Sequence, residues 1–579
     1  MTRSHLFLLL ACLLAACQDP PKLEQTFSIR LEPAVLNLRV TETGNVKIVL
    51  NRVGGFAETI TVSLGGEKVG LTATALTIPG GASEGTLSFQ AGDAAKIGTS
   101  FPTINAASGQ ITKTETLTLR VVKAIAEATT VMLEGKNGSS QLRQGSGTVL
   151  LEVIGKNLER ISAFKLGDLQ ATLLPGRTST RLELQTTIGH GTSIGVKNLI
   201  LTADGGETTY LGALTVTPIT AGLGGNDTTG VGTTERPYRT LNNALSIAQS
   251  GDTVRLLNGT YNSESGERWP TIAAGVLSPN IPVGVLVEGE STAGTVLEGP
   301  GTMTVAVGLA FTGAGGAGNL TVKNFVSGLF MTTGEIAINN VVSQMNGLGL
   351  VVGGGTVTVG GSEFKNNSFG ILVVGATTAL DVAASSSHDN TQDGLRVSDG
   401  ASTVHAVDFE AYNNVNGFSA AGQAKVTLER VKLHDNRDNG LKATEKAEVK
   451  ITGSELYTNA QAGLWFSGKN LIARSTNIRE NAAFGAYIEG NPVKVNFGSF
   501  TESGQNDLHG NGPNGNADQI LDVRPDRATL GDPEAFTLST TKLNGIVPAA
   551  DVYPGDGKWP YLNSPYFSVL GKNNVIRIY

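Results

Sequence analysis

The sequence predicts an all-β protein: two β-sandwiches followed by a parallel β-helix that begins with one short helix. The chain holds 75 glycines among 579 residues and only three tryptophans, a composition typical of short strands joined by tight turns. Apolar and polar residues alternate through roughly the first 200 residues, which indicates half-buried strands. Between residues 308 and 485 a short phrase that begins with glycine recurs every 20 to 24 residues, which indicates stacked structural repeats.

The N-terminus carries an export signal with a lipid-attachment motif. Arg3 precedes an apolar run from Leu6 to Leu14, and the letters LAAC, which end at Cys17, close it. A run this short is typical of a signal peptide and not of a membrane span. The LAAC motif resembles the lipobox of bacterial lipoproteins. That resemblance implies a signal peptide over residues 1–16, a lipid on Cys17 and a tether over residues 17–26.

The same region sets expectations for location and partners. No later apolar run approaches the roughly 20 residues of a membrane helix. We therefore expect an exported protein held to the bacterial cell envelope by its lipid alone, on the periplasmic or the cell-surface face. Cys12 and Cys17 are the only cysteines, so lipidation would leave no thiol for a disulfide or a metal. The net charge of −7 argues against a nucleic-acid partner.

Residues 27–122 and 128–218 are expected to form the two sandwiches. In the first, alternating segments such as Ile60–Leu64 are separated by glycine and proline turns, a pattern typical of Ig-like β-sandwiches. In the second, the stretch Val149–Leu158 reads VLLEVIGKNL. This strand with its Gly-x-Asn-Leu turn resembles the IPT/TIG family of Ig-like modules. Both modules are interpreted as spacers, since a fold alone does not assign a function.

The β-helix is expected over residues 222–579, opening with the stretch Pro237–Tyr261. Four apolar residues recur there at helical spacing: Leu241, Ala244, Leu245 and Ala248. They predict one short amphipathic helix with Thr240 as its N-cap, and such a helix covers the apolar end of a stack of repeats. The string PYRTL, followed by GDTV and GTY, resembles the opening of pectate-lyase-like proteins. That resemblance implies a right-handed parallel β-helix.

Each coil is marked by a glycine. These glycines are Gly308, Gly328, Gly349, Gly370, Gly394, Gly417, Gly440, Gly463 and Gly485. The residues one and three positions later are apolar in almost every coil, so both are expected to point into the core. Two further apolar segments complete a coil of three strands, with regular coils over residues 308–500 and a C-terminal cap over 501–579. A leucine-rich repeat has a similar period, but it needs leucines in a fixed pattern that these coils do not keep.

Most coils also carry an asparagine four residues before the glycine. The row so defined is Asn324, Asn366, Asn390, Asn413, Asn436, Asn459 and Asn481. Asparagine side chains that stack at a turn can bond one another and the turn backbone. The row is therefore interpreted as structural.

The outward positions of the coils are free to bind a partner. Two residues after the glycine, the later coils carry Arg396, Lys442, Trp465 and Tyr487. Cations suit carboxylates and flat rings suit sugar faces, and the pectate-lyase resemblance implies polysaccharide binding along this side. We predict a candidate carbohydrate-binding row in a cell-envelope lipoprotein that serves polysaccharide binding, adhesion or a structural role. The open alternative is a solvated strand with scattered large residues.

The alternative function is a polysaccharide lyase or glycoside hydrolase that acts on acidic glycans. A lyase neutralises the sugar carboxylate, often with calcium, so calcium is the one cofactor considered. A hydrolase needs two carboxylates about 5–10 Å apart, and Asp393 and Asp438 are the pair considered. His388 and His434 lie two coils apart, which is awkward for a shared zinc ion, and are interpreted as turn residues. Catalytic residues stay unassigned, and no metal site is predicted.

Overall fold

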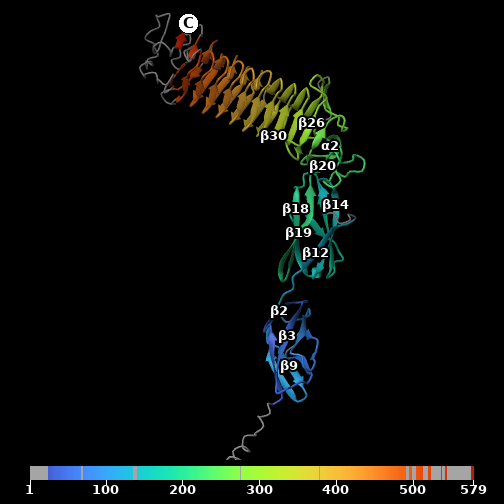
Figure 1. Ribbon diagram of the computed structural model, residues 1–579. Helices are drawn as coiled ribbons and strands as arrows, with labels where there is room; N and C mark the ends of the chain where they lie inside the picture. Colours follow the sequence, from blue (N-terminus) through green and yellow to red (C-terminus); the bar gives the residue numbers. More distant parts are fainter. Residues whose placement is uncertain are drawn as a thin grey trace, which may run out of the picture. The chain divides into compact units, whose positions relative to one another are not determined.

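The structure is a computed structural model that describes residues 24–66, 70–134, 140–273, 276–278, 280–376, 378–398, 400–490, 494–498, 504–512 and four short strands beyond. The signal peptide and Cys17 lie outside the described residues. Nearly all regular structure is β, as predicted. The chain divides into two compact units, one with most of the N-terminal sheets and one with the solenoid from Thr215 onward (Figure 1). No helix among the described residues is long and apolar enough to cross a membrane.

The N-terminal sheets are sandwich-like, and their strands alternate buried and exposed residues. The first region has the strand orders β1-β3-β7-β5, β10-β9-β4-β6 and β2-β11-β8. Its strands are β1 (Thr26–Glu32), β2 (Val35–Arg39), β3 (Thr43–Val53), β4 (Ile60–Gly65), β5 (Leu71–Ala73), β6 (Leu76–Ile78), β7 (Glu84–Ala91), β8 (Gly98–Ser100), β9 (Thr103–Ser108), β10 (Ile111–Thr116) and β11 (Thr118–Val122).

The second region has two sheets with the orders β12-β14-β17-β16 and β13-β19-β18-β15. Its elements are β12 (Glu127–Leu133), β13 (Gln141–Arg143), β14 (Gly147–Lys156), the 3-10 helix η1 (Leu158–Arg160), β15 (Ile161–Leu166), β16 (Ala171–Leu173), β17 (Arg181–Ile188), β18 (Gly195–Ala203) and β19 (Gly206–Thr217). In β17 every second residue is buried, the period that lets one face of a sheet pack on its partner.

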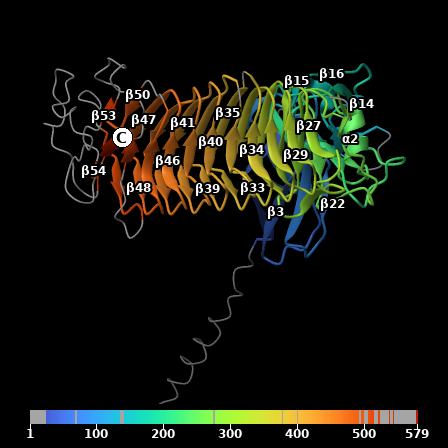
Figure 2. The ribbon, with the colours of Figure 1, turned by 90° about the horizontal axis from the view of Figure 1, so that it is seen from above.

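The C-terminal part is a right-handed parallel β-helix with three faces, as predicted. Face one is a single parallel sheet. Its strands are β27 (Val307–Phe311), β29 (Ser327–Met331), β31 (Leu348–Val352), β34 (Phe369–Val373), β37 (Leu395–Val397), β40 (Phe418–Ala420), β43 (Leu441–Ala443), β46 (Ala462–Phe466), β49 (Phe484–Ile488), β52 (Ile520–Asp522) and β55 (Ile576–Ile578). Figure 2 shows β29, β34, β40 and β46 following one another along the solenoid.

Faces two and three begin in shared strands. The opening elements are β20 (Ile219–Ala221), α2 (Leu241–Ile247), β21 (Thr253–Leu256), β22 (Gly259–Tyr261), the hairpin β23 (Thr271–Ala273) and β24 (Val276–Ser278), β25 (Val285–Gly289), β26 (Thr295–Glu298), β28 (Gly315–Lys323) and β30 (Glu335–Gln344). The strands β28 and β30 are long enough to serve both faces: their first halves continue β25 on face two, and their second halves continue β26 on face three.

Later coils give each face its own strand. Face two continues with β32 (Gly355–Gly360), β35 (Thr378–Ala383), β38 (Thr403–Val407), β41 (Lys425–Glu429), β44 (Glu448–Thr452), β47 (Asn470–Arg474), β50 (Lys494–Asn496) and β53 (Phe536–Thr537). Face three continues with β33 (Glu363–Lys365), β36 (Ser386–His388), β39 (Glu410–Tyr412), β42 (Lys432–His434), β45 (Glu455–Tyr457), β48 (Asn477–Arg479), β51 (Asp507–His509) and β54 (Lys542–Leu543). Parallel pairing therefore continues past residue 500. Trp559, Tyr561 and Tyr566, expected to help cover this end, lie outside the described residues.

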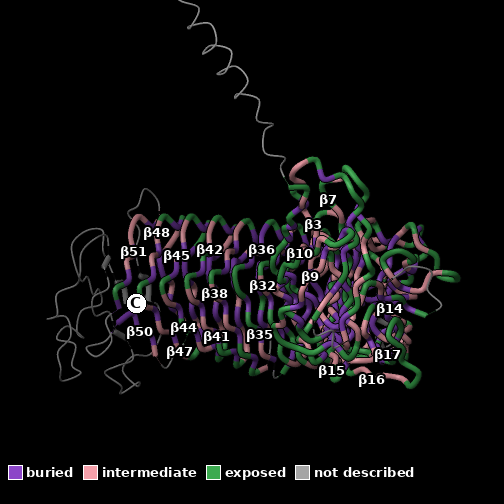
Figure 3. Tube along the Cα trace, turned by 90° about the horizontal axis from the view of Figure 1, so that it is seen from below, coloured by how far each residue is buried: buried purple, intermediate pink, exposed green. Residues whose placement is uncertain are grey.

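The core follows the predicted coil pattern. Leu395 and Val397 are at most 1% exposed, and their partners Phe418 and Ala420 are at most 3% exposed. Figure 3 shows buried residues alternating with exposed ones along the coils. At the start of the solenoid, α2 begins at the predicted N-cap: the Thr240 hydroxyl accepts a hydrogen bond from the Asn243 amide at 3.1 Å. Leu241 and Ala244 of this helix are buried, so α2 packs on the end of the core.

The asparagine row differs from the prediction in three places. The buried ladder contains Asn346, Asn367, Asn390, Asn414, Asn436, Asn459, Asn481 and Asn511. Asn324, Asn366 and Asn413 instead occupy the preceding position, where φ is near +55° to +62°. Asparagine is among the few residues that tolerate this left-handed backbone. The turn thus favours asparagine at two adjacent positions for two different reasons, and a count back from the glycine does not separate them.

Candidate functional site

The predicted carbohydrate-binding row is continuous on face one. Arg396 pairs in register with Ser419, Ser419 with Lys442, Lys442 with Trp465, and Trp465 with Tyr487. Each occupies the central position of its strand, between two core residues, so its side chain points outward. The structure therefore brings all four predicted residues into one line and adds Ser419. We call these five residues the binding row.

The C-terminal end of the binding row is a packed aromatic cluster. The Lys442 ammonium lies 4.6 Å from the centroid of the Trp465 ring, and the Tyr487 ring meets Trp465 at 5.2 Å with an interplanar angle of 71°. The Trp465 indole N–H donates to Glu489 Oε1 at 2.8 Å. Burial, together with the nearby Glu489 carboxylate, raises the pKa of Tyr487. These contacts hold the indole in place before any ligand arrives, which lowers the entropy cost of binding.

The N-terminal end of the binding row is formed by Arg396. Its guanidinium carbon lies 5.5 Å from the centroid of the Phe369 ring, and its Nε donates to Ser398 Oγ at 3.1 Å. Its Nη1 is 4.0 Å from Asp393 Oδ2. Arg396 is nevertheless exposed, so donors of the guanidinium fork remain accessible to a carboxylate.

The two acids considered for hydrolysis do not form an accessible pair. Asp393 is 5% exposed. Its Oδ1 accepts from Asn416 Nδ2 at 2.8 Å, and its Oδ2 accepts from Ser419 Oγ at 2.6 Å. Asp438 lies one position off this column, because its amide bonds to the carbonyl of Val415, the residue before Asn416. Asp393 therefore acts as a bonded support under Ser419, and this geometry assigns neither acid a catalytic role.

The two histidines are not turn residues but the last residues of β36 and β42 on face three. With the tyrosines between and after them they form a ring stack, His388, Tyr412, His434 and Tyr457, with centroid separations of 4.5, 5.2 and 4.6 Å. The planes differ by at most 9°. Arg479 continues the stack with its guanidinium 4.2 Å from the Tyr457 centroid. We call this set the ring column.

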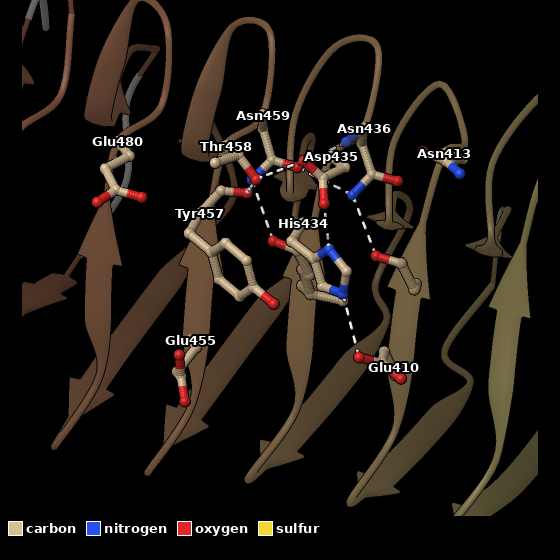
Figure 4. A network of polar contacts seen from close by, with 12 residues as sticks. Glu410, Asn413, His434, Asp435, Asn436, Glu455, Tyr457, Thr458, Asn459 and Glu480 are labelled. Atoms are coloured by element: carbon tan, nitrogen blue, oxygen red, sulfur yellow. Dashed lines mark hydrogen bonds and ion pairs between the residues drawn. The ribbon is translucent and has the colours of Figure 1, made fainter.

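Carboxylates engage both nitrogens of each imidazole in the ring column. His388 Nδ1 lies 2.6 Å from Asp389 Oδ2, and its Nε2 lies 2.9 Å from Glu363 Oε1. His434 repeats the arrangement with Asp435 at 2.6 Å and Glu410 at 3.1 Å, as Figure 4 shows. With ring faces stacked and ring nitrogens engaged, the column is a structural device and not a nucleophile or a metal site.

Sequence reasoning missed the ring column because it compared His388 and His434 with Ala411. In the structure Ala411 pairs with Ser387 and Leu433, and Tyr412 is the true equivalent of the histidines. Aromatic or imidazole side chains at consecutive spacings of 24, 22 and 23 residues would have revealed it. No group of three or more His, Cys, Asp and Glu residues in the described part of the chain is placed to hold a metal ion.

Comparison with known proteins supports the β-helix assignment. The family described as right handed beta helix region matches residues 370–517. No curated protein sequence matches the chain significantly.

Among solved structures, the chain is similar to a mutant of the periplasmic alginate epimerase AlgG, with 12% identity and a TM-score of 0.34 over 48% of this chain and 66% of that one, just under two thirds. The pectate lyase Pel9A has 14% identity and a TM-score of 0.30, with 63% of this chain and 97% of that one covered. An α-1,3-glucanase from Streptomyces thermodiastaticus has 12% identity and a TM-score of 0.35, with 75% and 97% covered. Such low scores say nothing of the substrate of this chain.

Proposed function

We propose that the protein is a cell-envelope lipoprotein whose β-helix binds polysaccharide along the binding row. The observation that carries this proposal is the unbroken register from Arg396 to Tyr487, with cations and aromatic rings on one outward line. Successive coils repeat at about 4.8 Å, a step comparable to the length of one pyranose. A linear glycan that runs along the solenoid axis would meet one side chain of the row per sugar.

The chemistry of the row suits a glycan with carboxylates. Arg396 and Lys442 offer N–H donors for a uronate, and the Trp465 and Tyr487 rings offer apolar surface for a sugar face. Adjacent coils carry Ser419 and, at the edge of the row, Ser398, whose hydroxyls can bond to sugar hydroxyls. No group on this face is assigned a catalytic role, so binding rather than turnover is proposed.

The N-terminal parts fit the same role. Lipidation of Cys17 would hold the protein to the membrane, and the two sandwiches, of which the second is interpreted as an IPT/TIG-like module, would serve as spacers. The lipid is proposed as the only membrane contact. The proposed partner is a cell-surface or extracellular polysaccharide.

Gel retardation of the full chain in acidic and neutral polysaccharides tests the proposal. We expect retardation in at least one acidic polysaccharide and, for Trp465→Ala, a loss of affinity of about tenfold, or about 1.4 kcal/mol. Phe101→Ala is the matched control, because Phe101 is an aromatic residue of the first sandwich that is 66% exposed. Unchanged retardation of Trp465→Ala would refute the binding row. New reducing ends or unsaturated uronates in the same mixtures would instead favour the lyase or hydrolase alternative.

A further inference from the structure

A second polar groove lies on face three, at the end of that face nearer the start of the solenoid. Its volume is about 340 Å³, within the range of small-ligand sites. The residues that line it are Thr292, Ala293, Val296, Thr321, Lys323, Val342, Gln344 and Lys365. Both charged residues among them are lysines, so the groove itself carries positive charge only.

The groove is fixed by hydrogen bonds before a ligand binds. Its wall is the loop that precedes β26, and the Thr292 hydroxyl donates to the Asn340 carbonyl at 3.1 Å. On the floor, the Thr321 hydroxyl donates to the Thr292 carbonyl at 2.8 Å. The loop is therefore tied at one residue to two strands of the solenoid. A wall held in this way costs little further ordering on binding.

Three polar side chains stand in one register row along the groove. Lys323 pairs with Gln344, and Gln344 pairs with Lys365. The two ammonium groups thus arise from backbones two coils, or about 10 Å, apart. The row then continues into the ring column, because Lys365 pairs with His388.

Each lysine retains donors for a ligand. Lys323 Nζ lies 3.0 Å from Glu298 Oε1, and Lys365 Nζ lies 2.8 Å from Glu363 Oε2. An ammonium has three donors, and among the described residues one carboxylate engages each of these two. Neither glutamate lines the groove. Such partly exposed pairs contribute about 1 kcal/mol or less, so they orient the ammonium groups without preventing a further carboxylate from binding.

The Gln344 amide and the apolar floor complete the set. Within the described part of the chain, the Gln344 side chain makes no hydrogen bond, and it offers both a donor and an acceptor to the groove. Val296 and Val342 are half-buried and present an apolar surface between the polar groups. Flat apolar contact flanked by hydrogen-bonding groups is the complement of a sugar ring.

We propose that this groove is a second glycan site, which binds two or three consecutive uronate residues of an acidic polysaccharide. The carboxylates bind the Lys323 and Lys365 ammonium groups, the Gln344 amide bonds to sugar hydroxyls, and the ring faces rest on Val296 and Val342. The site stands on a different face from the binding row and does not depend on the function proposed for it.

Calorimetric titration of the full chain with trigalacturonate tests the site, with neutral maltotriose as the reference ligand. The titration is repeated in the Trp465→Ala chain, which separates this site from the binding row. We expect Lys323→Met/Lys365→Met to weaken trigalacturonate binding at least tenfold in both backgrounds. Maltotriose should bind more weakly than trigalacturonate to the unaltered chain.

Two further variants make the outcome decisive. Lys425→Met/Lys450→Met removes the same charge from exposed positions of face two and should leave binding unchanged. Ala293→Trp fills the groove from its exposed wall without a change of charge and should weaken binding like the lysine pair. Equal affinity of the groove variants and the unaltered chain, or an equal loss in the control pair, overturns the second site. A loss in Trp465→Ala alone would support the binding row and refute the groove.

Discussion

Asn413 and Asn414 are neighbours in one turn with different physical roles. Asn413 is exposed and has a φ of 55°. Asn414 is fully buried: its Nδ2 donates to the Ser387 carbonyl at 2.9 Å, and its Oδ1 accepts from Asn390 Nδ2 at 2.9 Å. The first residue is selected for its backbone conformation, and the second satisfies buried polar groups of the coils beside it.

We predict that Asn414→Ala destabilises the solenoid by about 3 kcal/mol, because it leaves several buried polar groups without partners at about 1–3 kcal/mol each. Asn413→Gly keeps a left-handed backbone accessible and should cost under about 1 kcal/mol. Urea unfolding of both full-length variants, followed by circular dichroism, measures the difference. If the two variants are equally stable, the buried ladder has been assigned to the wrong residue.

The carboxylates of the ring column make the solenoid sensitive to acid. The hydrogen bond from His388 is the largest cause of the lowered pKa of Asp389. Burial alone would raise the pKa of Asp435, but hydrogen bonds from His434 and Thr458 outweigh it and lower that pKa too. A carboxyl whose folded pKa lies below its unfolded value of about 3.9 stabilises the fold above that pH. This contribution is lost as the pH falls through the folded pKa.

We therefore predict that Asp389→Asn/Asp435→Asn lowers stability at pH 7 and flattens its fall between about pH 5 and pH 3. Asparagine tolerates the left-handed backbone of both positions, so strain does not confuse the result. Acid unfolding curves of the variant and the unaltered chain measure the slope, with Asp438→Asn as a control that removes a carboxyl from the next turn. An unchanged acid slope would contradict this role of the column.

At the scale of the element, α2 depends on a carboxyl from a distant loop. Glu267 is 5% exposed, and its Oε1 accepts from the Leu241 amide at 2.7 Å at the start of the helix. Burial raises the pKa of Glu267 from 4.5 to about 7. Between these two values the folded protein holds a proton that the unfolded chain has lost. Stability from this group is thus fully present below about pH 4.5 and is lost as the pH rises through about 7.

We predict that Glu267→Gln removes a loss of about 3 kcal/mol between pH 4.5 and pH 7, since each unit of pKa shift corresponds to about 1.4 kcal/mol. The glutamine oxygen can still accept from the Leu241 amide, so the helix start is retained. Urea unfolding at several pH values in this window gives the slope for both chains. Parallel slopes would show that Glu267 does not titrate in the folded protein.

At the scale of the whole molecule, the proposed function depends on attachment through Cys17. We predict that Cys17→Ser abolishes lipidation, so that the protein moves from the detergent phase to the aqueous phase in a Triton X-114 partition. The substitution lies outside all sheets of the solenoid, so the isolated variant should bind polysaccharide as the unaltered chain does. Detergent-phase partitioning of Cys17→Ser would contradict the lipid anchor.

The sequence alone determined the β-helix, its three strands per coil and the outward line from Arg396 to Tyr487. These follow from local periodicity, because a parallel stack repeats the same environment at the same position of every coil. The α2 cap and its Thr240 N-cap were also readable, since capping depends on residues next to one another in the chain.

Only the tertiary structure decided which residues share a column when coil lengths differ. Spacings of 22 to 24 residues moved Asn414 one place from the counted position and hid the equivalence of His388, Tyr412 and His434. The groove of Lys323, Gln344 and Lys365 likewise needs the loop at Thr292 as its wall, and that contact joins segments that no period relates. Register across coils is set by hydrogen bonding between strands, and one inserted residue is enough to change it.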